Sequence, residues 1–332
     1  MSIPGVLGPL SSMNIVTAIV DAHVHLHTCY QADELLDNAS GNLSRARTNV
    51  PLTGPRALYL LLAECRDDDC FSQLRALALG QQPGHALDEQ PGQAARERSG
   101  PAAGEHSEQA ARAHSGPAAG EPAGKPLQLK AWSAAPTAEE SSVVVTKGGQ
   151  QLFIVAGRQV ACREGLEVLI LGTTQRFEDG RPIRELLSET DPLGVPRVIP
   201  WGPGKWLFSR GRLLNRLLEE FRKPTLFLGD EGGRPGFWGY PSHFAIAARM
   251  GVRDLPGTDP LPFSHDVTKV GRMGFTIPVD LDPARPAASL IRSLTDPAST
   301  FERFATLEPP LRFVRNQIGM QLRKRRSVTR LA

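Results

Sequence analysis

Short apolar runs, typical of buried strands, recur along the chain. They lie at 15–20, 57–65, 167–172, 197–201, 225–230 and 252–259. The run at 57–65 also fits the start of a helix, because periodicity does not separate the two in a short segment. Between them, residues 143–162 carry β-branched and aromatic runs separated by turn signals at Lys147-Gly148-Gly149 and Ala156-Gly157-Arg158. This pattern predicts an antiparallel meander.

Helical periodicity appears between and after the later strands. Residues 212–222 place five apolar side chains on one stripe, and Ser242 can cap a helix that runs to Met250 and stops at Gly251. Near the end of the chain another apolar stripe precedes a basic RKRR segment at 323–326. Strands that alternate with helices indicate a parallel sheet.

Residues 81–126 differ in kind from the rest of the chain. The segment is rich in Ala, Gly, Pro and charge, and QAARERSGPAAGEH at Gln93 recurs as QAARAHSGPAAGEP at Gln109, 16 residues later. With almost no large apolar side chain, it offers too little burial to offset the entropy of ordering it. We expect a disordered insertion. The flanking blocks, 1–80 and 127–332, total about 285 residues, the size of one α/β barrel.

The composition excludes several classes of protein. Of 332 residues, 40% are hydrophobic and 22% charged, which is typical of neither a disordered chain nor a membrane protein. A net charge of +3 is too small to indicate a nucleic-acid partner. Four cysteines without a CxxC pair do not make a disulfide scaffold. No membrane span or signal peptide is evident, and we expect a cytoplasmic protein.

The sharpest chemical feature is Asp21-Ala22-His23-Val24-His25-Leu26-His27. Alternate residues of a strand share a face, so His23 and His25 should lie beside Asp21, while Val24 packs on the other side. Two neutral imidazoles at the end of a buried strand suit a divalent metal such as zinc. A hydrogen-bonded pair of half-buried histidines is the alternative. His27 falls where the following loop could begin.

A second feature is Pro256-Gly257-Thr258-Asp259-Pro260, which follows the apolar run at 252–255. Barrel enzymes place catalytic groups at the carboxyl ends of their parallel strands, and Asp259 would occupy such a position. An aspartate that caps the turn before Pro260 is the competing interpretation.

Together, VDAHVHLH and PGTDPLPF resemble the motifs of the amidohydrolase superfamily of metal-dependent hydrolases. The resemblance implies a (β/α)8 barrel, here distorted by the β-meander and interrupted by the insertion. It implies that His23 and His25 hold the metal. Asp259 would be both a ligand and the group that accepts a proton from the attacking water.

The family's further middle-strand histidines are missing, since no histidine lies between Lys125 and Ser242. Glu64, Asp230 and Glu231 could replace them. Asp230 is the preferred supporting acid because it ends an apolar strand, although a turn aspartate between glycines is the alternative. For Glu64, a solvated residue on a helix is the alternative.

Two aromatic loops could form a rim for a small-molecule substrate. The loop at 199–206 carries Trp201 and Lys205, and Arg234 lies with further aromatic residues after Asp230. An aromatic rim with a cation suits an anionic or planar molecule. Packing within the loops themselves explains Trp201 equally well.

The preferred function is hydrolysis of a C–N or ester-type bond with one divalent metal, expected to be zinc. Two alternatives remain open. One is a non-catalytic barrel that lost its ligands and serves as a binding or scaffold protein. The other is a phosphoesterase similar to histidinol phosphatase. We expect no nucleic-acid partner, because the basic segment at 323–330 is more commonly a solvated helix end.

Overall fold

The computed structural model describes residues 14–48, 52, 54–82 and 126–329. Nearly all of the predicted insertion, 81–126, lies outside these residues. Within them the chain forms twelve strands and seven α-helices, and the strands make two separate sheets.

The first sheet has seven strands in the order β12-β11-β1-β2-β5-β4-β3. Its members are β1 (Ile15–Val24), β2 (Arg56–Leu62), β3 (Ser133–Pro136), β4 (Ser142–Lys147), β5 (Gln150–Val155), β11 (Met273–Asp280) and β12 (Glu302–Ala305). At its centre, β1 and β2 are parallel, as are β2 and β5. The pairs toward both edges are antiparallel.

The second sheet has five strands in the order β10-β9-β8-β7-β6. They are β6 (Gly157–Ala161), β7 (Glu167–Leu171), β8 (Arg197–Pro200), β9 (Leu226–Glu231) and β10 (Arg253–Gly257). The last three are parallel, and β6, β7 and β8 are antiparallel. The expected meander is therefore split: β4 and β5 pair in the first sheet, whereas β6 begins the second.

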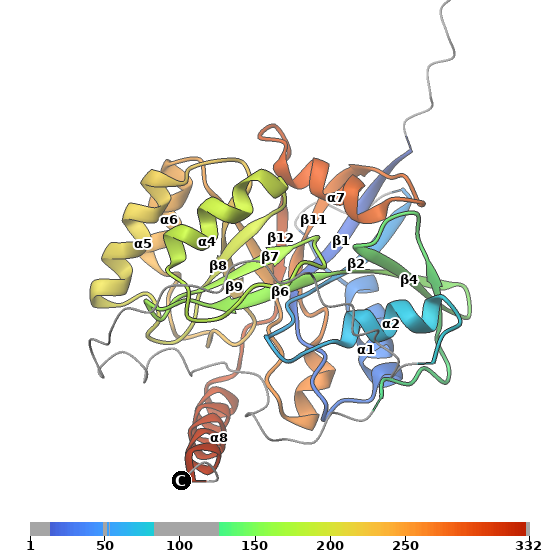
Figure 1. Cartoon of the computed structure of the whole chain (residues 1–332), viewed down its shortest axis with the longest axis horizontal. Coiled ribbons are helices and arrows are strands. Elements are labelled where there is room, and N and C mark those ends of the chain that lie inside the picture. The colour runs from blue at the N-terminus through green and yellow to red at the C-terminus, as the bar shows by residue number, and fades with distance from the viewer. Residues whose placement is uncertain (1–13, 49–51, 53, 83–125, 330–332) are drawn as a thin grey trace, which may run out of the picture.

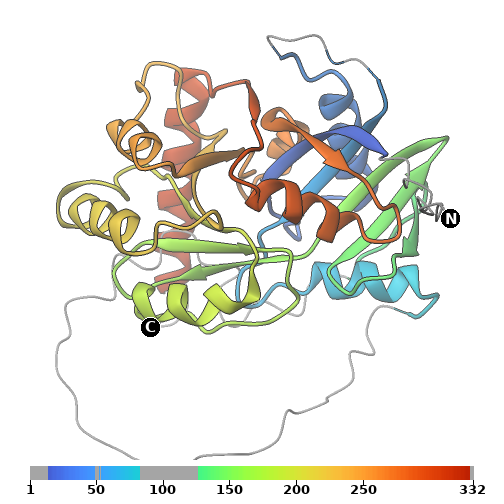
Figure 2. The same cartoon turned by 90° about the horizontal axis from the view of Figure 1, so that it is seen from above.

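Helices cover the outer faces of both sheets (Figures 1 and 2). On the first sheet lie α1 (Ala32–Ser44) and α2 (Cys70–Ala78), and on the second lie α4 (Ile183–Thr190), α5 (Phe208–Glu220) and α6 (Ser242–Arg249). Between the sheets is a central core, which includes Val20, Phe227 and Phe275 and is closed by α7 (Pro286–Thr295). The last helix, α8 (Pro310–Thr329), lies at one edge of the molecule (Figure 1).

The expected (β/α)8 barrel is wrong, because the two mixed sheets do not form one closed barrel. The apolar runs were located correctly, but their pairing was not evident from the sequence. Hairpins such as β4–β5 and β6–β7 supply antiparallel partners without intervening helices, whereas a parallel barrel needs a helical crossover after every strand.

The two sheets nevertheless meet at two places. After β2, Glu64 forms an isolated bridge with Arg158, and its N–H donates to the Gly157 carbonyl at 3.1 Å. After β10, the N–H of Asp259 donates to the carbonyl of His23 at 2.8 Å. The carboxyl ends of β1, β2, β9 and β10 are therefore drawn together.

No helix in the described ranges is both long enough and apolar enough to cross a membrane.

We predict that Gly157→Ala destabilises the fold by about 2 kcal/mol or more, because the new methyl would force β6 away from β2. An added Cβ would lie 2.3 Å from the carbonyl oxygen of Leu62. Urea unfolding measures the change. Gly239→Ala is the control, since a Cβ there meets nothing within 4 Å, and its effect should stay within about 0.5 kcal/mol. Equal stabilities for the two variants would contradict the prediction.

Candidate metal centre

His23 and His25 lie at the end of β1 and face the space between the sheets. Regular alternation would place residues 22 and 24 on one side, but Ala22 joins the central core and Val24 joins the outer core with Ile19. The pairing register of β1 with β2 shifts between Asp21 and Val24, which accounts for the change. His23 and His25 thus share a face as expected, but Asp21 lies on the other one.

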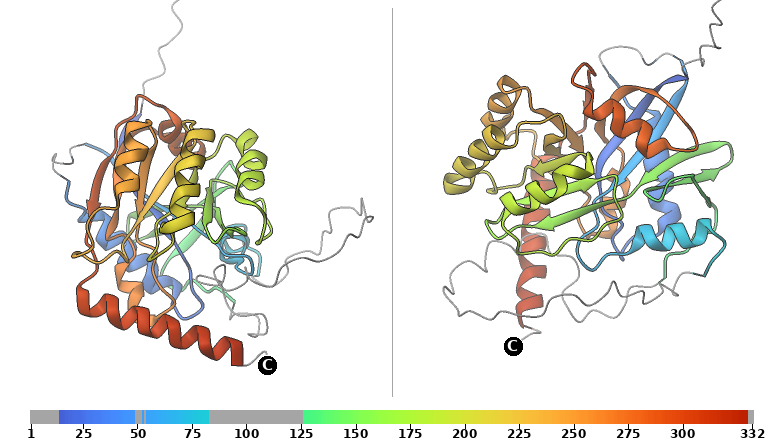
Figure 3. Two further views of the ribbon diagram at one scale, coloured as in Figure 1. Left: turned by 90° about the vertical axis from the view of Figure 1, so that its left-hand side faces the viewer. Right: turned by 45° about the horizontal axis from the view of Figure 1, so that its top comes forward.

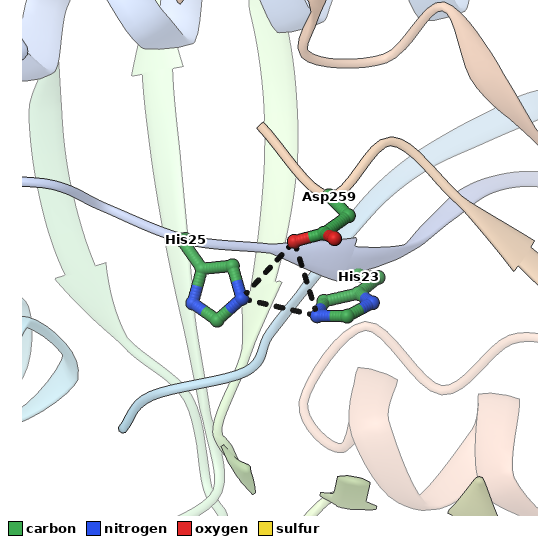
Figure 4. A group of neighbouring side chains, drawn as sticks. All are labelled: His23, His25 and Asp259. Atoms are coloured by element: carbon green, nitrogen blue, oxygen red, sulfur yellow. Dashed lines mark hydrogen bonds and ion pairs between the residues drawn. The ribbon is translucent and has the colours of Figure 1, made fainter. Parts of the chain in front are cut away.

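Asp259 completes a compact group with the two imidazoles (Figure 4). The Nε2 atoms of His23 and His25 are 3.0 Å apart. The Oδ1 atom of Asp259 lies 3.6 Å from His23 Nε2 and 3.4 Å from His25 Nε2. All three side chains are buried. Residues separated by more than 230 positions therefore converge, as the two motifs predicted.

The backbone of Asp259 is strained in a way that serves this geometry. Its φ of 45° lies in the left-handed region, which aspartate tolerates better than most residues but still enters at a cost. Just before it, Gly257 allows β10 to approach β1, because a Cβ there would lie 2.4 Å from the His23 nitrogen. No other residue fits this crossing without moving the strands apart.

Asp21 fastens the loop that carries Asp259. Its carboxylate accepts hydrogen bonds from the N–H and hydroxyl of Thr258, at 2.8 and 2.5 Å, and from the N–H of Gly271 at 2.9 Å. The N–H of His23 donates to it at 3.3 Å. Burial raises the pKa of Asp21 to about 6, against the opposite effect of these donors. One carboxylate thus connects β1 to the Asp259 loop and to the start of β11.

The second sheet contributes a chain of polar groups to the same site. Gln159 on β6 places its Oε1 3.0 Å from His23 Nε2, while its amide N–H donates to Glu167 Oε2 at 3.2 Å. Glu167 on β7 also accepts from Lys205 Nζ at 2.5 Å. All three side chains are buried. Because Gln159 donates to Glu167, its carbonyl oxygen is the atom that faces the imidazoles.

Of the adjacent acids on β9, Glu231 and not Asp230 faces the histidines. Glu231 Oε1 lies 3.8 Å from His23 Nδ1. The preferred supporting acid, Asp230, points away and pairs with Arg234 at 2.9 Å and Arg303 at 2.5 Å. Period-two alternation explains the difference, because neighbouring strand residues point to opposite sides. Asp230 and Arg234 therefore lie in a structural ion cluster.

The remaining predicted residues occupy varied positions. Trp201 is buried and packs edge-on against Trp238, with ring centroids 5.7 Å apart, so its contacts are internal. Lys205 is connected to the site by its hydrogen bond to Glu167.

Glu64 pairs with Arg158 at 2.9 Å and accepts a hydrogen bond from the Phe71 N–H, which makes it part of the junction between the sheets. His27 bonds the Pro260 carbonyl at 2.8 Å and supports the Asp259 loop.

Beyond these, Cys65 and Asp68 lie near the other side of His25. Ligand atoms of His25, Cys65 and Asp68 are within 4.8 Å of one another. The N–H of Cys65 donates to Asp68 Oδ2 at 2.9 Å, which holds the aspartate at this position. His25 therefore belongs to two groups of potential metal ligands.

Burial dominates the electrostatics of the centre. It lowers the pKa of His23 to about 4, although Asp259 acts in the opposite direction. Burial also lowers the pKa of His25, but hydrogen bonds to Asp259 and Cys65 outweigh it and the pKa is raised. The pKa of Glu231 is raised by burial and by the nearby Asp259 carboxylate. A buried group of several carboxylates with one lysine is a site that favours an additional positive charge.

Sequence reasoning missed Gln159 and Glu167. Glu167 begins the apolar run at 167–172, and an acid at that position is a weak signal for a strand-end site. Gln159 carries no such signal, because it lies inside a short strand whose pairing was not predictable. Only the meeting of the two sheets brings it to His23.

Comparison of the chain with protein-family models, with curated proteins and with solved structures gives no match. The amidohydrolase resemblance accordingly rests on the two motifs alone.

We predict that Asp21→Asn destabilises the protein by about 3 kcal/mol, since an amide nitrogen would face buried N–H groups that the carboxylate now accepts from. Chemical unfolding measures the loss. Asp37→Asn is a matched control: Asp37 pairs with Lys147 at 2.6 Å at the surface, and its loss should cost less than about 1 kcal/mol. If Asp21→Asn lowered the free energy of unfolding no more than this control, the role of Asp21 in holding the Asp259 loop would be wrong.

Proposed function

We propose that this chain is a metal-dependent hydrolase that binds one divalent cation, zinc by preference, at His23, His25 and Asp259. The observation that carries the proposal is the crowding of electron-rich atoms. His23 Nε2 lies 3.0 Å from both His25 Nε2 and Gln159 Oε1, with Asp259 Oδ1 close by. A single ring proton satisfies only one of these contacts, whereas a cation would satisfy all of them.

The two distances from the imidazoles to Asp259 suit zinc, and the two imidazoles lie slightly closer together than zinc ligands do. With Zn–N and Zn–O bonds of about 2.0–2.2 Å in a tetrahedron, ligand atoms are about 3.3–3.6 Å apart. The three separations among His23, His25 and Asp259 are 3.0, 3.6 and 3.4 Å. Two imidazoles and a carboxylate are also a donor set used in catalytic zinc sites. The proposal therefore rests on the local geometry and not on the barrel, which the sheets do not form.

A zinc ion held by His23, His25 and Asp259 would supply Lewis-acid chemistry toward water and a carbonyl or ester group. In this proposal, the Asp259 carboxylate would accept the proton of an attacking water. Glu231 Oε1 lies 3.8 Å from His23 Nδ1 and would favour a ring orientation that directs Nε2 into the site. Gln159 supplies a neutral oxygen whose direction is fixed by Glu167 and Lys205. A C–N or ester-type bond of a small molecule is the substrate class we infer.

We predict that zinc binds the purified protein and raises its Tm by about 5 °C when present at 100 times its Kd, because binding to the folded state alone adds about 2.7 kcal/mol. Calorimetry and thermal unfolding with and without a chelator measure both effects. In His23→Ala/His25→Ala, zinc should no longer shift the Tm.

His243→Ala is the matched control, since His243 packs against Trp206 away from the centre. It should bind zinc as the wild type does. Absence of zinc, manganese or cobalt binding to the wild type would refute the metal centre and leave a non-catalytic binding protein as the better interpretation. Binding that persists in the double variant would show that the metal lies elsewhere.

We further predict that Gln159→Ala weakens zinc binding by about 10- to 100-fold, through loss of a positioned oxygen next to the metal ligands. Competition with a chromogenic chelator measures the affinity. Gln151→Ala is a suitable control because Gln151 is an exposed residue of the adjacent β5. Unchanged affinity in Gln159→Ala would exclude Gln159 from the centre while leaving the histidines untested by that experiment.

A further inference from the structure

The last helix, α8, presents an apolar stripe to the surroundings. Leu311, Val314, Ile318 and Leu322 are 87%, 51%, 56% and 50% exposed. Their spacing of three or four residues aligns them on one side of the helix. Figure 3 shows α8 along one edge of the molecule. Stripes of this kind on a helix are normally buried against something.

The opposite side of α8 is already occupied by the protein. Asn316 is buried, and a Cβ at Gly319 would lie 2.8 Å from the ring of Phe263. Arg312 donates to the carbonyl of His265, and Arg323 donates to that of Pro262, both at 3.2 Å. The helix is therefore held with its apolar stripe outward. Rotating the stripe inward would break these contacts.

The charge of this segment is of one sign. Between Pro309 and Ala332 the sequence has seven Arg and Lys residues and no Asp or Glu. Four of the seven are consecutive, at 323–326, directly after the last residue of the stripe. Adjacent to the first turn, Phe237 is 63% exposed and packs against Phe313 of α8, with ring centroids 6.1 Å apart. Exposed apolar side chains are thus followed in the sequence by a run of cations.

We propose that α8 docks on an anionic phospholipid surface, with its apolar stripe at the acyl boundary and its cations on the headgroups. An amphipathic helix with basic residues binds such a surface in two ways: its apolar side chains are buried at the acyl boundary, and its cations are attracted to the anionic headgroups. A partner of another kind would be complementary to either the apolar stripe or the cations, but not to both. A nucleic acid would leave the stripe exposed, and a second copy of α8 would bring two basic segments of the same sign together.

Docking would affect the Asp259 loop, because α8 rests on it. Arg323 contacts the Pro262 carbonyl and Arg312 contacts the His265 carbonyl, and Arg312 also lies 3.4 Å from the buried Asp266. Asp266 in turn accepts from the N–H of Leu261, two residues after Asp259. A docked α8 would therefore hold this loop within about one helix diameter, roughly 10 Å, of the lipid.

The test is co-sedimentation of the full chain with vesicles of neutral phosphatidylcholine and with vesicles that also contain phosphatidylglycerol. We expect binding at least about tenfold stronger to the anionic vesicles, and a decrease with added salt. Leu311→Ser/Ile318→Ser should reduce binding to the anionic vesicles about fivefold or more. Lys324→Gln/Arg325→Gln should reduce both this binding and its salt dependence.

Leu79→Ser/Leu193→Ser is the matched control, because these side chains are 48% and 39% exposed on other elements. It should bind as the wild type does.

Several results would overturn the proposal. One is no sedimentation with anionic vesicles, or equal sedimentation with neutral ones. Another is a dimer, detected by light scattering, that Leu311→Ser/Ile318→Ser dissociates without changing vesicle binding. This result would show that the apolar stripe binds a second copy of the chain. Binding to an oligonucleotide without binding to vesicles would assign the cations to nucleic acid. Zinc binding is measured separately, so either proposal can fail alone.

Discussion

The close approach of β10 to β1 is the constraint on which the rest of the site depends. Gly257 permits the two backbones to touch at His23, and the hydrogen bond from Asp259 N–H to the His23 carbonyl joins them. Asp21 adds a buried carboxylate that binds Thr258 and Gly271 together. Without this contact the two sheets would lose one of their two junctions, and Asp259 would have no fixed position relative to the imidazoles.

The second junction has a different chemistry. There, Glu64 and Arg158 form a buried ion pair next to a backbone bridge, and Gly157 again allows two strands to come close. Buried ion pairs contribute little net stability after desolvation, but breaking one partner is costly. Such a pair therefore specifies where the sheets meet more than how strongly they adhere.

The centre between these junctions is polar inside an apolar core. Burying carboxylates, an amide and a lysine is unfavourable unless each finds a partner. Lys205, Glu167 and Gln159 do so in series and end at His23. The strained backbone of Asp259 is a further cost. Sites at which a fold tolerates several such costs together are commonly functional, which agrees with the proposed cation at this position.

The sequence by itself determined the local features. Apolar runs located β1, β7, β8 and β9, helical periodicity located α5, α6 and α8, and the HxH and GTD motifs identified His23, His25 and Asp259. These depend on residues close in sequence, which periodicity and motif spacing describe. Only the tertiary structure decided how the strands pair, and it replaced the expected barrel with two open sheets.

The same limit applies to the site. Strand alternation at β9 selected Glu231 over Asp230, the bulge in β1 turned Asp21 away from the histidines, and the split meander brought Gln159 to His23. Each outcome depends on register or on contacts between distant strands. A shift of one residue reverses the face of every side chain that follows. Local sequence does not encode that choice, because it is made by the packing of one sheet against the other.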